Sequence, residues 1–412
     1  MPAATAARRR PATPARRAAY TVLRRVFEDG AWADRALRSA ADGLDGRERA
    51  LATQLAYGAV QRAGALDHVA AQLAERPVET LDPPVRAALR LGLFQLLYLD
   101  GIPPHAAVDE SVQLARRDAP RAAGLVNAVL RRAARERPKV GDEHSVPAWL
   151  AQKWRAELGD GEARALLVAI NAPAESALRV NTLVTTRETL LEHVPGHAAP
   201  DDPDAIVLDE PFDAHGHQLF RAGHYQPQSR GSQRVARALD PRPGERVLDL
   251  CAAPGGKTTH LAALMGGEGE VLAVERDPRR ADGLQRTVKR LHADRIVRVQ
   301  TADATAVEGR FDRVLVDPPC SGLGTLQSRP DLRWHATPDG PLELQARILD
   351  AAAACAPHRI VYSTCTISRQ ENEGQVEAFL ERHPRFALSA TTVTLPHRDG
   401  TDGFYIATLD AA

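Results

Sequence analysis

Cysteine is scarce in this chain of 412 residues, and none of its cysteines forms a Cys-x-x-Cys pair. Without that spacing we expect no metal site, and we expect thiols that stay reduced in a cytoplasmic protein. No apolar run approaches the roughly 20 residues that a membrane-spanning helix requires, so we expect no membrane partner. The four cysteines are Cys251, Cys320, Cys355 and Cys365.

Acidic side chains are absent from residues 1–27, although acidic and basic residues balance over the whole chain, with 53 of each. The arginines of this stretch suit contact with a phosphate backbone. A solvated tail that owes its arginines to compositional bias is the alternative. Serine is also missing there, which disfavours a transit peptide. These arginines are Arg8, Arg9, Arg10, Arg16, Arg17, Arg24 and Arg25.

Strand-like alternation is lacking between residue 15 and about residue 137. Apolar residues recur there at helical spacing, and residues 85–99 are apolar nearly all round, as in the central helix of a bundle. We therefore expect a disordered basic tail over residues 1–14 and an all-α domain over residues 15–140.

A charged stretch with proline and glycine, near residues 138–143, marks a boundary. Beyond it the pattern mixes helix and strand, and we expect a small α+β connecting domain over residues 145–225. Its expected helices cover residues 150–158 and 164–171, and its expected strands cover residues 177–181 and 205–208.

The last part of the chain, residues 226–412, alternates short apolar or β-branched runs with helical stretches. This alternation predicts a parallel sheet with helices on both faces, in an α/β Rossmann-like domain. Periods of 20 to 50 residues do not recur, which disfavours a solenoid. The expected strands are residues 246–250, 270–274, 296–301, 313–316 and 359–362.

A glycine turn, Cys251–Lys257, follows the first of these strands and leads into a helix, as in a nucleotide-binding crevice. A P-loop would require glycine where the chain has Cys251, so a triphosphate site is disfavoured. Glu275 ends the next strand, where a carboxylate accepts hydrogen bonds from ribose hydroxyls, and Asp303 follows the third. Each acid alone is also explained as a helix cap or a loop charge. Because G-x-G-x-x-G is missing, the three features together favour S-adenosyl-L-methionine over a dinucleotide.

Two cysteines follow the next two strands, Cys320 in Asp317-Pro318-Pro319-Cys320 and Cys365 in Ser363-Thr364-Cys365-Thr366. Neighbouring strands would bring both sulfurs to one crevice beside the methyl donor. C5 of cytosine is a poor nucleophile, and a thiolate that adds to C6 activates it. Asp317 is placed to bind the N3 and 4-amino edge of the base. Lys257 is either a charge within the site or a cap of the turn in solvent.

These motifs resemble the Sun-type (Fmu) RNA cytosine-5 methyltransferases. The resemblance extends over essentially the whole chain, because residues 15–137 resemble the NusB-like RNA-binding domain of that family. One departure is the short Ala356-Pro357-His358-Arg359 stretch, where the family usually has a longer glycine turn. Further motifs that match are Gln228-Ser229, Ser321-Gly322-Leu323-Gly324, Arg329-Pro330-Asp331 and Asp402-Gly403-Phe404-Tyr405.

The resemblance implies that Cys365 is the nucleophile and that Cys320 assists elimination and product release. It also implies an enzyme that acts on RNA, with 16S ribosomal RNA as the expected substrate. We expect a monomer, because no heptad pattern or large apolar surface demands a partner. The implied catalytic residues are Cys365, Cys320 and Asp317. The implied S-adenosyl-L-methionine site comprises Cys251, Ala252, Ala253, Pro254, Gly255, Gly256, Lys257, Glu275, Asp303 and Asp317.

Several other functions are compatible with part of the pattern. A transfer RNA cytosine-5 methyltransferase would use the same chemistry on another RNA. An amino-methyltransferase would carry an aromatic residue at position 320, and a DNA enzyme would leave Cys365 unexplained. A ribosome-assembly factor that only binds RNA would have lost pocket residues, and this sequence keeps them.

Overall fold

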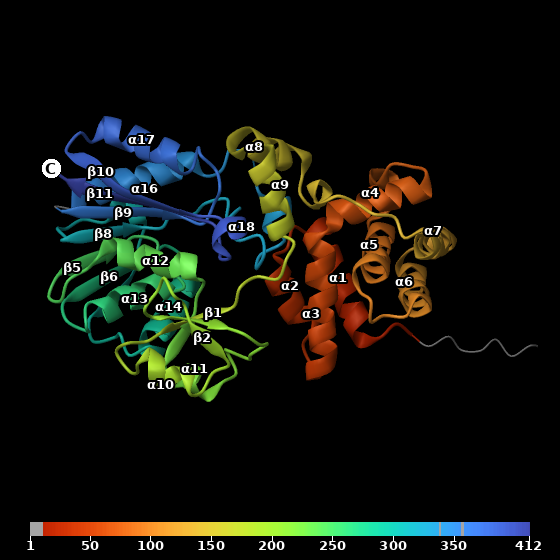
Figure 1. The fold of residues 1–412 in the computed structure, drawn as a ribbon, viewed down its shortest axis with the longest axis horizontal. Helices are drawn as coiled ribbons and strands as arrows, with labels where there is room; N and C mark the ends of the chain where they lie inside the picture. Colours follow the sequence, from red (N-terminus) through yellow and green to blue (C-terminus); the bar gives the residue numbers. More distant parts are fainter. Residues whose placement is uncertain (1–10, 338, 356–357) are drawn as a thin grey trace, which may run out of the picture. The chain divides into compact units, whose positions relative to one another are not determined.

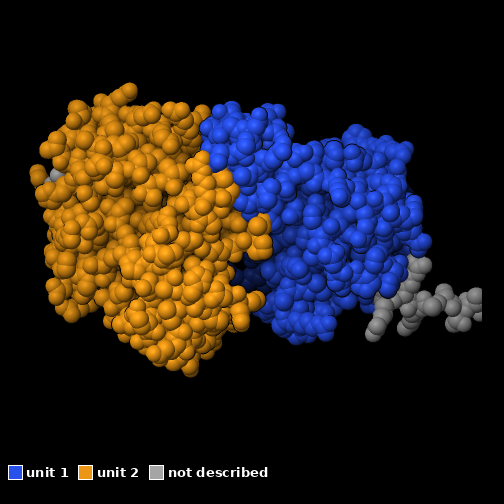
Figure 2. Space-filling model, viewed as in Figure 1, with its two compact units in different colours: residues 1–171, 329–335 blue, residues 172–328, 336–412 orange. Residues whose placement is uncertain are grey.

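A computed structural model gives the structure of the chain and describes residues 11–337, 339–355 and 358–412. The chain divides into two compact units (Figure 2). The first runs up to Asn171 and includes the distant segment Arg329–His335, and the second contains Ala172–Ser328 and Ala336–Ala412. Of the tail expected to be disordered, residues 1–10 lie outside the described residues, and Ala12 is buried.

The first unit is helical, as the sequence predicts, and its N-terminal helices share a single hydrophobic core (Figure 1). Its central helix is α5, Pro83–Tyr98, which is buried on nearly all sides because its sequence is apolar nearly all round. The other helices are α1 (Pro14–Glu28), α2 (Ala33–Ala40), α3 (Gly46–Gln61), α4 (Ala63–Ala74), η1 (Val78–Thr80), α6 (Pro104–Asp118), η2 (Pro120–Ala122), α7 (Ala123–Glu136), η3 (Asp142–Ser145), α8 (Ala148–Leu158), α9 (Asp160–Ala169) and α15 (Leu332–His335).

The arginine-rich start of the chain is not a uniform basic arm. Arg16 lies on α1, is 7% exposed, donates to Gln95 Oε1 at 2.7 Å and pairs with Glu110 at 3.1 Å. Arg24 pairs with Glu28 and Asp118. The expectation that these arginines face a phosphate backbone is therefore wrong for Arg16, which holds the helices together instead.

The second unit begins with a small antiparallel sheet in the order β2-β3-β1-β4. The predicted strands correspond to β1 (Ala177–Val180) and β3 (Ala205–Leu208), whereas β2 (Gly196–Ala198) and β4 (Tyr225–Pro227) have three residues each and no apolar alternation. Two short helices accompany the sheet, α10 (Arg187–Leu191) and α11 (Gln218–Arg221).

The large sheet has the order β10-β11-β9-β8-β5-β6-β7 within the described residues. Its strands are β5 (Arg246–Asp249), β6 (Glu270–Glu275), β7 (Val297–Thr301), β8 (Arg313–Val316), β9 (Arg359–Thr364), β10 (Phe386–Thr394) and β11 (Phe404–Ala411). Strands β5 to β9 are parallel, as predicted, but β11 and β10 extend the sheet antiparallel to their neighbours. The expectation of a wholly parallel sheet is thus wrong. The sequence did not predict β10, because this strand carries mainly Ala, Ser and Thr that face solvent and show no apolar alternation.

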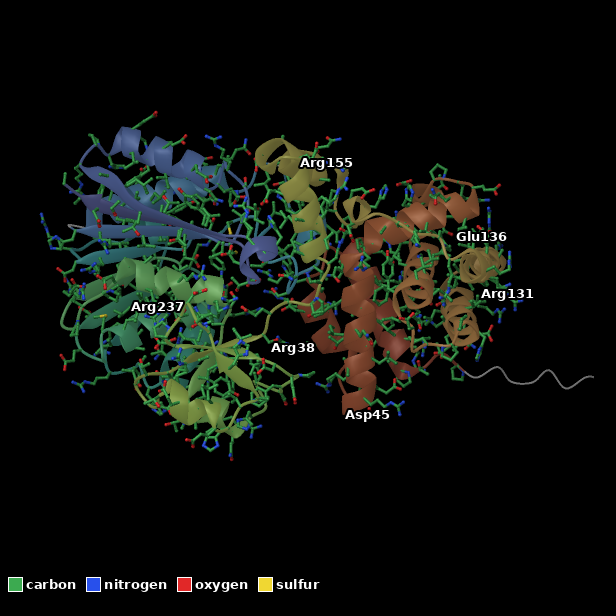
Figure 3. All side chains as sticks on the ribbon, viewed as in Figure 1. Arg38, Asp45, Arg131, Glu136, Arg155 and Arg237 are labelled. Carbon is green, nitrogen blue, oxygen red and sulfur yellow. The ribbon has the colours of Figure 1, made fainter. Side chains whose placement is uncertain are left out.

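Helices cover both faces of this sheet (Figure 1). Adjacent residues of β5 point to opposite faces, so Val247 joins the core beneath one set of helices and Leu248 joins the core beneath the other. Arg237 on α12 (Figure 3) pairs with Asp202 at 3.1 Å and with Asp204, which ties α12 to the small sheet. The helices are α12 (Arg230–Leu239), α13 (Gly256–Leu264), α14 (Pro278–Arg290), η4 (Ala304–Ala306), α16 (Leu342–Cys355), α17 (Glu373–Arg382) and α18 (Pro396–Asp399).

Candidate active site

The candidate site lies in the second unit, at the carboxyl ends of the central parallel strands. The turn Cys251–Lys257 follows β5, Asp317 follows β8 and Cys365 follows β9. Strands β5, β8 and β9 are adjacent in the sheet, with Val316 in register with Tyr362. Because parallel strands end at one edge, the loops that carry these residues meet there.

The two cysteines expected to share a crevice do lie together. Their sulfur atoms are 3.4 Å apart, neither cysteine is in a disulfide and both residues are partly exposed. The hydrogen bond with Cys365 raises the pKa of Cys320 well above its usual value, helped by burial and by the charges of Glu371 and Asp317. The raised pKa favours the protonated form of Cys320, and either sulfur can donate the hydrogen bond between the two.

Asp317 is held at both carboxylate oxygens. Lys257 Nζ donates to Oδ2 at 2.7 Å, and Ser363 Oγ donates to Oδ1 at 2.9 Å. Burial pulls the pKa of Lys257 down, but Asp317 more than offsets it, so that the pKa of Lys257 is raised and the amine stays charged. Lys257 is 15% exposed and lies 5.2 Å from the ring of Phe404. The interpretation of Lys257 as a solvent-facing cap of the turn is thus wrong.

The glycine turn is shaped by backbone geometry. Gly255 has φ +101°, a left-handed conformation that glycine adopts easily, and α13 starts at the next residue. A Cβ on Gly255 would lie 2.7 Å from Leu284 Cδ1. Ala252 N donates to Val274 O, which fastens the turn to β6. Cys251 is largely enclosed, and burial raises the pKa of its thiol, so that it stays protonated.

The two acids at the carboxyl ends of β6 and β7 have different surroundings. Glu275 at the end of β6 is 6% exposed, accepts from Asp277 N at 2.9 Å and lies 3.4 Å from Arg280. Asp303 is exposed and caps η4, accepting from Thr305 N at 2.8 Å, and its hydrogen bonds with Thr305 lower its pKa. Cys355 is buried on α16, as the sequence predicts for a core residue.

Two residues near the site escaped the sequence reasoning. Arg179 on β1 is 1% exposed and donates to Gly256 O, to Gln228 Oε1 at 2.6 Å and to Thr259 Oγ1 at 2.9 Å, so it holds the start of α13. Burial lowers its pKa to about 9. An arginine within the apolar run Ala177–Val180 was a visible signal. Glu371 is 2% exposed and accepts from Ser321 N at 2.9 Å, but nothing in the sequence around it predicts that contact.

Comparison with known proteins assigns the family. The family described as 16S rRNA methyltransferase RsmB/F matches residues 236–410. A probable ribosomal RNA small subunit methyltransferase B of Synechocystis is 35% identical, over 97% of this chain and 99% of its own. The chain belongs to the RsmB/F methyltransferase family. This confirms the resemblance inferred from the motifs. Within the RsmB/F chain, the NusB family also matches residues 13–135, and the ferredoxin-like domain of RsmF/B-like methyltransferases matches residues 146–215.

Other relatives agree with this membership. The ribosomal RNA small subunit methyltransferase B of Thermus thermophilus is 39% identical over 91% of this RsmB/F chain and 92% of its own. The solved structure of PH0851 is similar with a TM-score of 0.81 and 29% identity, covering 96% of this chain and 98% of the other. Within the described ranges, no helix is long and apolar enough to cross a membrane.

Proposed function

We propose that this protein transfers a methyl group from S-adenosyl-L-methionine to C5 of a cytosine in RNA through a covalent adduct with Cys365. The observation that carries the proposal is the pair of cysteine sulfurs 3.4 Å apart, in the loops that follow β8 and β9, where Asp317 also lies. A single cysteine would serve for the attack alone. A second thiol at this distance is suited to the elimination that must follow.

The residues present fit S-adenosyl-L-methionine. A glycine turn follows β5, Glu275 ends β6 and Asp303 follows β7, and these three strands are consecutive in the sheet. The turn offers close backbone approach, and the carboxylates suit the ribose hydroxyls and the adenine amino group. When bound, S-adenosyl-L-methionine supplies an electrophilic methyl group. The proposed site comprises Cys251–Lys257, Glu275, Asp303 and Asp317.

The attack uses the charge distribution of the thiol pair. The Cys365 thiolate forms a bond to C6, and the electron pair of the C5=C6 bond moves toward C5. Asp317 accepts a hydrogen bond from the 4-amino group and so stabilises the developing enamine, while Lys257 and Ser363 hold the carboxylate in place. C5 then takes the methyl group.

Elimination follows from the same geometry. Once Cys365 is bonded to C6 its negative charge is gone, and with it the main cause of the raised pKa of Cys320. Cys320 releases its proton to water and, as a thiolate, removes the proton from C5. The electrons of that C–H bond re-form the C5=C6 double bond, and the C6–S electron pair returns to Cys365. One proton is released overall.

The proposed substrate is 16S ribosomal RNA in the cytoplasm, because relatives that align over nearly the whole chain are named as small-subunit ribosomal RNA methyltransferases. Transfer RNA is the second candidate, since the same site chemistry applies to it. Bisulfite sequencing of both RNAs from cells with and without the gene separates them. Loss of one 5-methylcytidine in 16S RNA supports the proposal, a loss in transfer RNA redirects the substrate, and no loss favours an RNA-binding assembly factor.

The thiol roles are tested with Cys365→Ala and Cys320→Ala, incubated with RNA and cofactor and resolved on denaturing gels. Cys365→Ala should form no adduct and lose transfer by at least about a thousandfold, because the nucleophile is gone. Cys320→Ala should still attack and should accumulate a protein–RNA adduct. Cys355→Ala is the matched control, since that thiol lies in the core. An adduct with Cys365→Ala would reverse the two assignments.

A further inference from the structure

We infer that Glu371 is a positioning residue whose buried charge keeps the proton of the thiol pair on Cys320 and the negative charge on Cys365. The inference deepens the proposed function and rests on it. The hydrogen bonds of the Glu371 carboxylate go to Ser321 and Gln345, so its charge acts on the sulfurs through space.

The carboxylate of Glu371 joins both cysteine loops. It accepts hydrogen bonds from Ser321 N at 2.9 Å, from Ser321 Oγ, and from Gln345 Nε2 at 3.0 Å. Ser321 Oγ lies 2.6 Å from Thr366 Oγ1. Ser321 directly follows Cys320, and Thr366 directly follows Cys365. One side chain therefore sets the separation of the two loops.

The charge of Glu371 is not neutralised by an ion pair. It is 2% exposed, and in the described part of the chain no basic side chain lies within ion-pair distance of it. Its hydrogen-bond donors are a backbone amide, a hydroxyl and an amide side chain, all uncharged. A buried carboxylate in this state exerts a negative potential on groups nearby.

The potential is asymmetric across the sulfur pair. The charges of Glu371 and Asp317 raise the pKa of Cys320, and the Glu371 carboxylate lies against Ser321, the residue after Cys320, whereas Lys257 interacts electrostatically with Cys365. Asp249 also interacts electrostatically with Lys257, and Tyr362, which interacts with Cys320, donates its phenol hydrogen to Glu371 O at 2.7 Å. A proton is favoured near the anion and a thiolate near the cation. Cys365, the cysteine that interacts with Lys257, is the one that the proposed function requires as nucleophile.

The test measures where the thiolate resides, without any methyl transfer. Full-length wild type and Glu371→Gln are treated briefly with iodoacetamide near neutral pH, and alkylation at Cys320 and Cys365 is quantified separately by peptide mass spectrometry. Glutamine keeps the size of the side chain and removes its charge. We expect alkylation of Cys320 relative to Cys365 to rise about tenfold, because removing the charge should lower the pKa of the Cys320 thiol by about one unit. Glu381→Gln, at an exposed position on α17, is the control and should leave the ratio unchanged.

Two further measurements separate charge from shape. Glu371→Asp keeps the charge and shortens the side chain, so its alkylation ratio should stay near that of wild type. In the wild type alone, Cys365 should alkylate at lower pH than Cys320, a result that does not depend on any variant folding. An unchanged ratio in folded Glu371→Gln, or wild-type Cys320 alkylating first, would overturn the inference. If the wild-type protein formed no 5-methylcytidine in RNA, that result would count against the proposed function and would leave the measured alkylation ratios standing.

Discussion

Asp249 is a buried acid at the end of β5, directly before the glycine turn. It is 1% exposed, and Thr258 Oγ1 donates to its Oδ2 at 2.8 Å. Burial is the largest cause that raises its pKa, from 3.8 to about 7, with a smaller contribution from Asp317. The hydrogen bond from Thr258 and the charge of Lys257 oppose the rise. The folded protein therefore binds a proton here that the unfolded chain has lost.

Because the folded state binds this extra proton, the free energy of unfolding falls as pH rises. The pKa of Asp249 in the folded state lies above its unfolded value, so its contribution is fully present below pH 3.8 and is lost as pH rises through about 7. Asp249→Asn removes this dependence. Denaturant unfolding between these limits should show the variant gaining stability over wild type as pH rises, at about 1.4 kcal/mol for each unit of pKa difference. A difference that is constant with pH would contradict the assignment.

The element that shapes the cofactor site is the turn from β5 into α13. Gly255 adopts φ +101° there and leaves no room for a Cβ, since Leu284 Cδ1 would lie 2.7 Å away. Leu284 belongs to the core beneath that face of the sheet, so it cannot withdraw cheaply. Arg179 holds the same turn from the small sheet. The start of α13 is thus constrained from two sides.

Gly255→Ala should lower the free energy of unfolding by about 2–4 kcal/mol, because the left-handed backbone and the clash both cost energy. Two other glycines separate these effects in thermal or denaturant unfolding. Gly266 has φ +63° and open space around it, so Gly266→Ala should cost only the backbone strain, about 1 kcal/mol. Gly256, without positive φ and with its nearest neighbour at 3.7 Å, should tolerate alanine best. Equal costs at all three positions would refute this account.

At the scale of the whole molecule, the chain returns to the helical unit at Arg329–His335, between the two sequence segments that make up the second unit. Arg333 in that returning segment is fully buried, and its guanidinium donates to the carbonyls of Gln61, Ser145 and Ile170. Asp331 Oδ2 accepts from Ala33 N at 2.9 Å, and Trp334 Nε1 donates to Val60 O at 2.7 Å. The first unit is therefore complete only when Arg329–His335 has packed into it.

Arg333→Met should destabilise this unit by about 3 kcal/mol or more, because several buried carbonyls lose their donor at once. Hydrogen exchange of the full-length variant should show faster exchange around residues 60–62 and 167–171, with the sheet of the second unit unaffected. Arg333→Lys should rescue only part of the loss, since an ammonium cannot span these carbonyls as the planar guanidinium does. Unchanged exchange in the helical unit would contradict the role given to this segment.

The sequence by itself determined the helical first domain, the five parallel strands, the glycine turn and the meeting of Cys320 with Cys365, because each follows from local periodicity or from the position of a residue at a strand end. The tertiary structure alone decided the features that depend on distant pairing. Strands β10 and β11, the insertion of Arg329–His335 into the helical unit, and the contacts of Arg179 and Glu371 belong to this second group. Their partners lie tens to hundreds of residues away, and only the packed chain brings a buried charge to the groups that it holds.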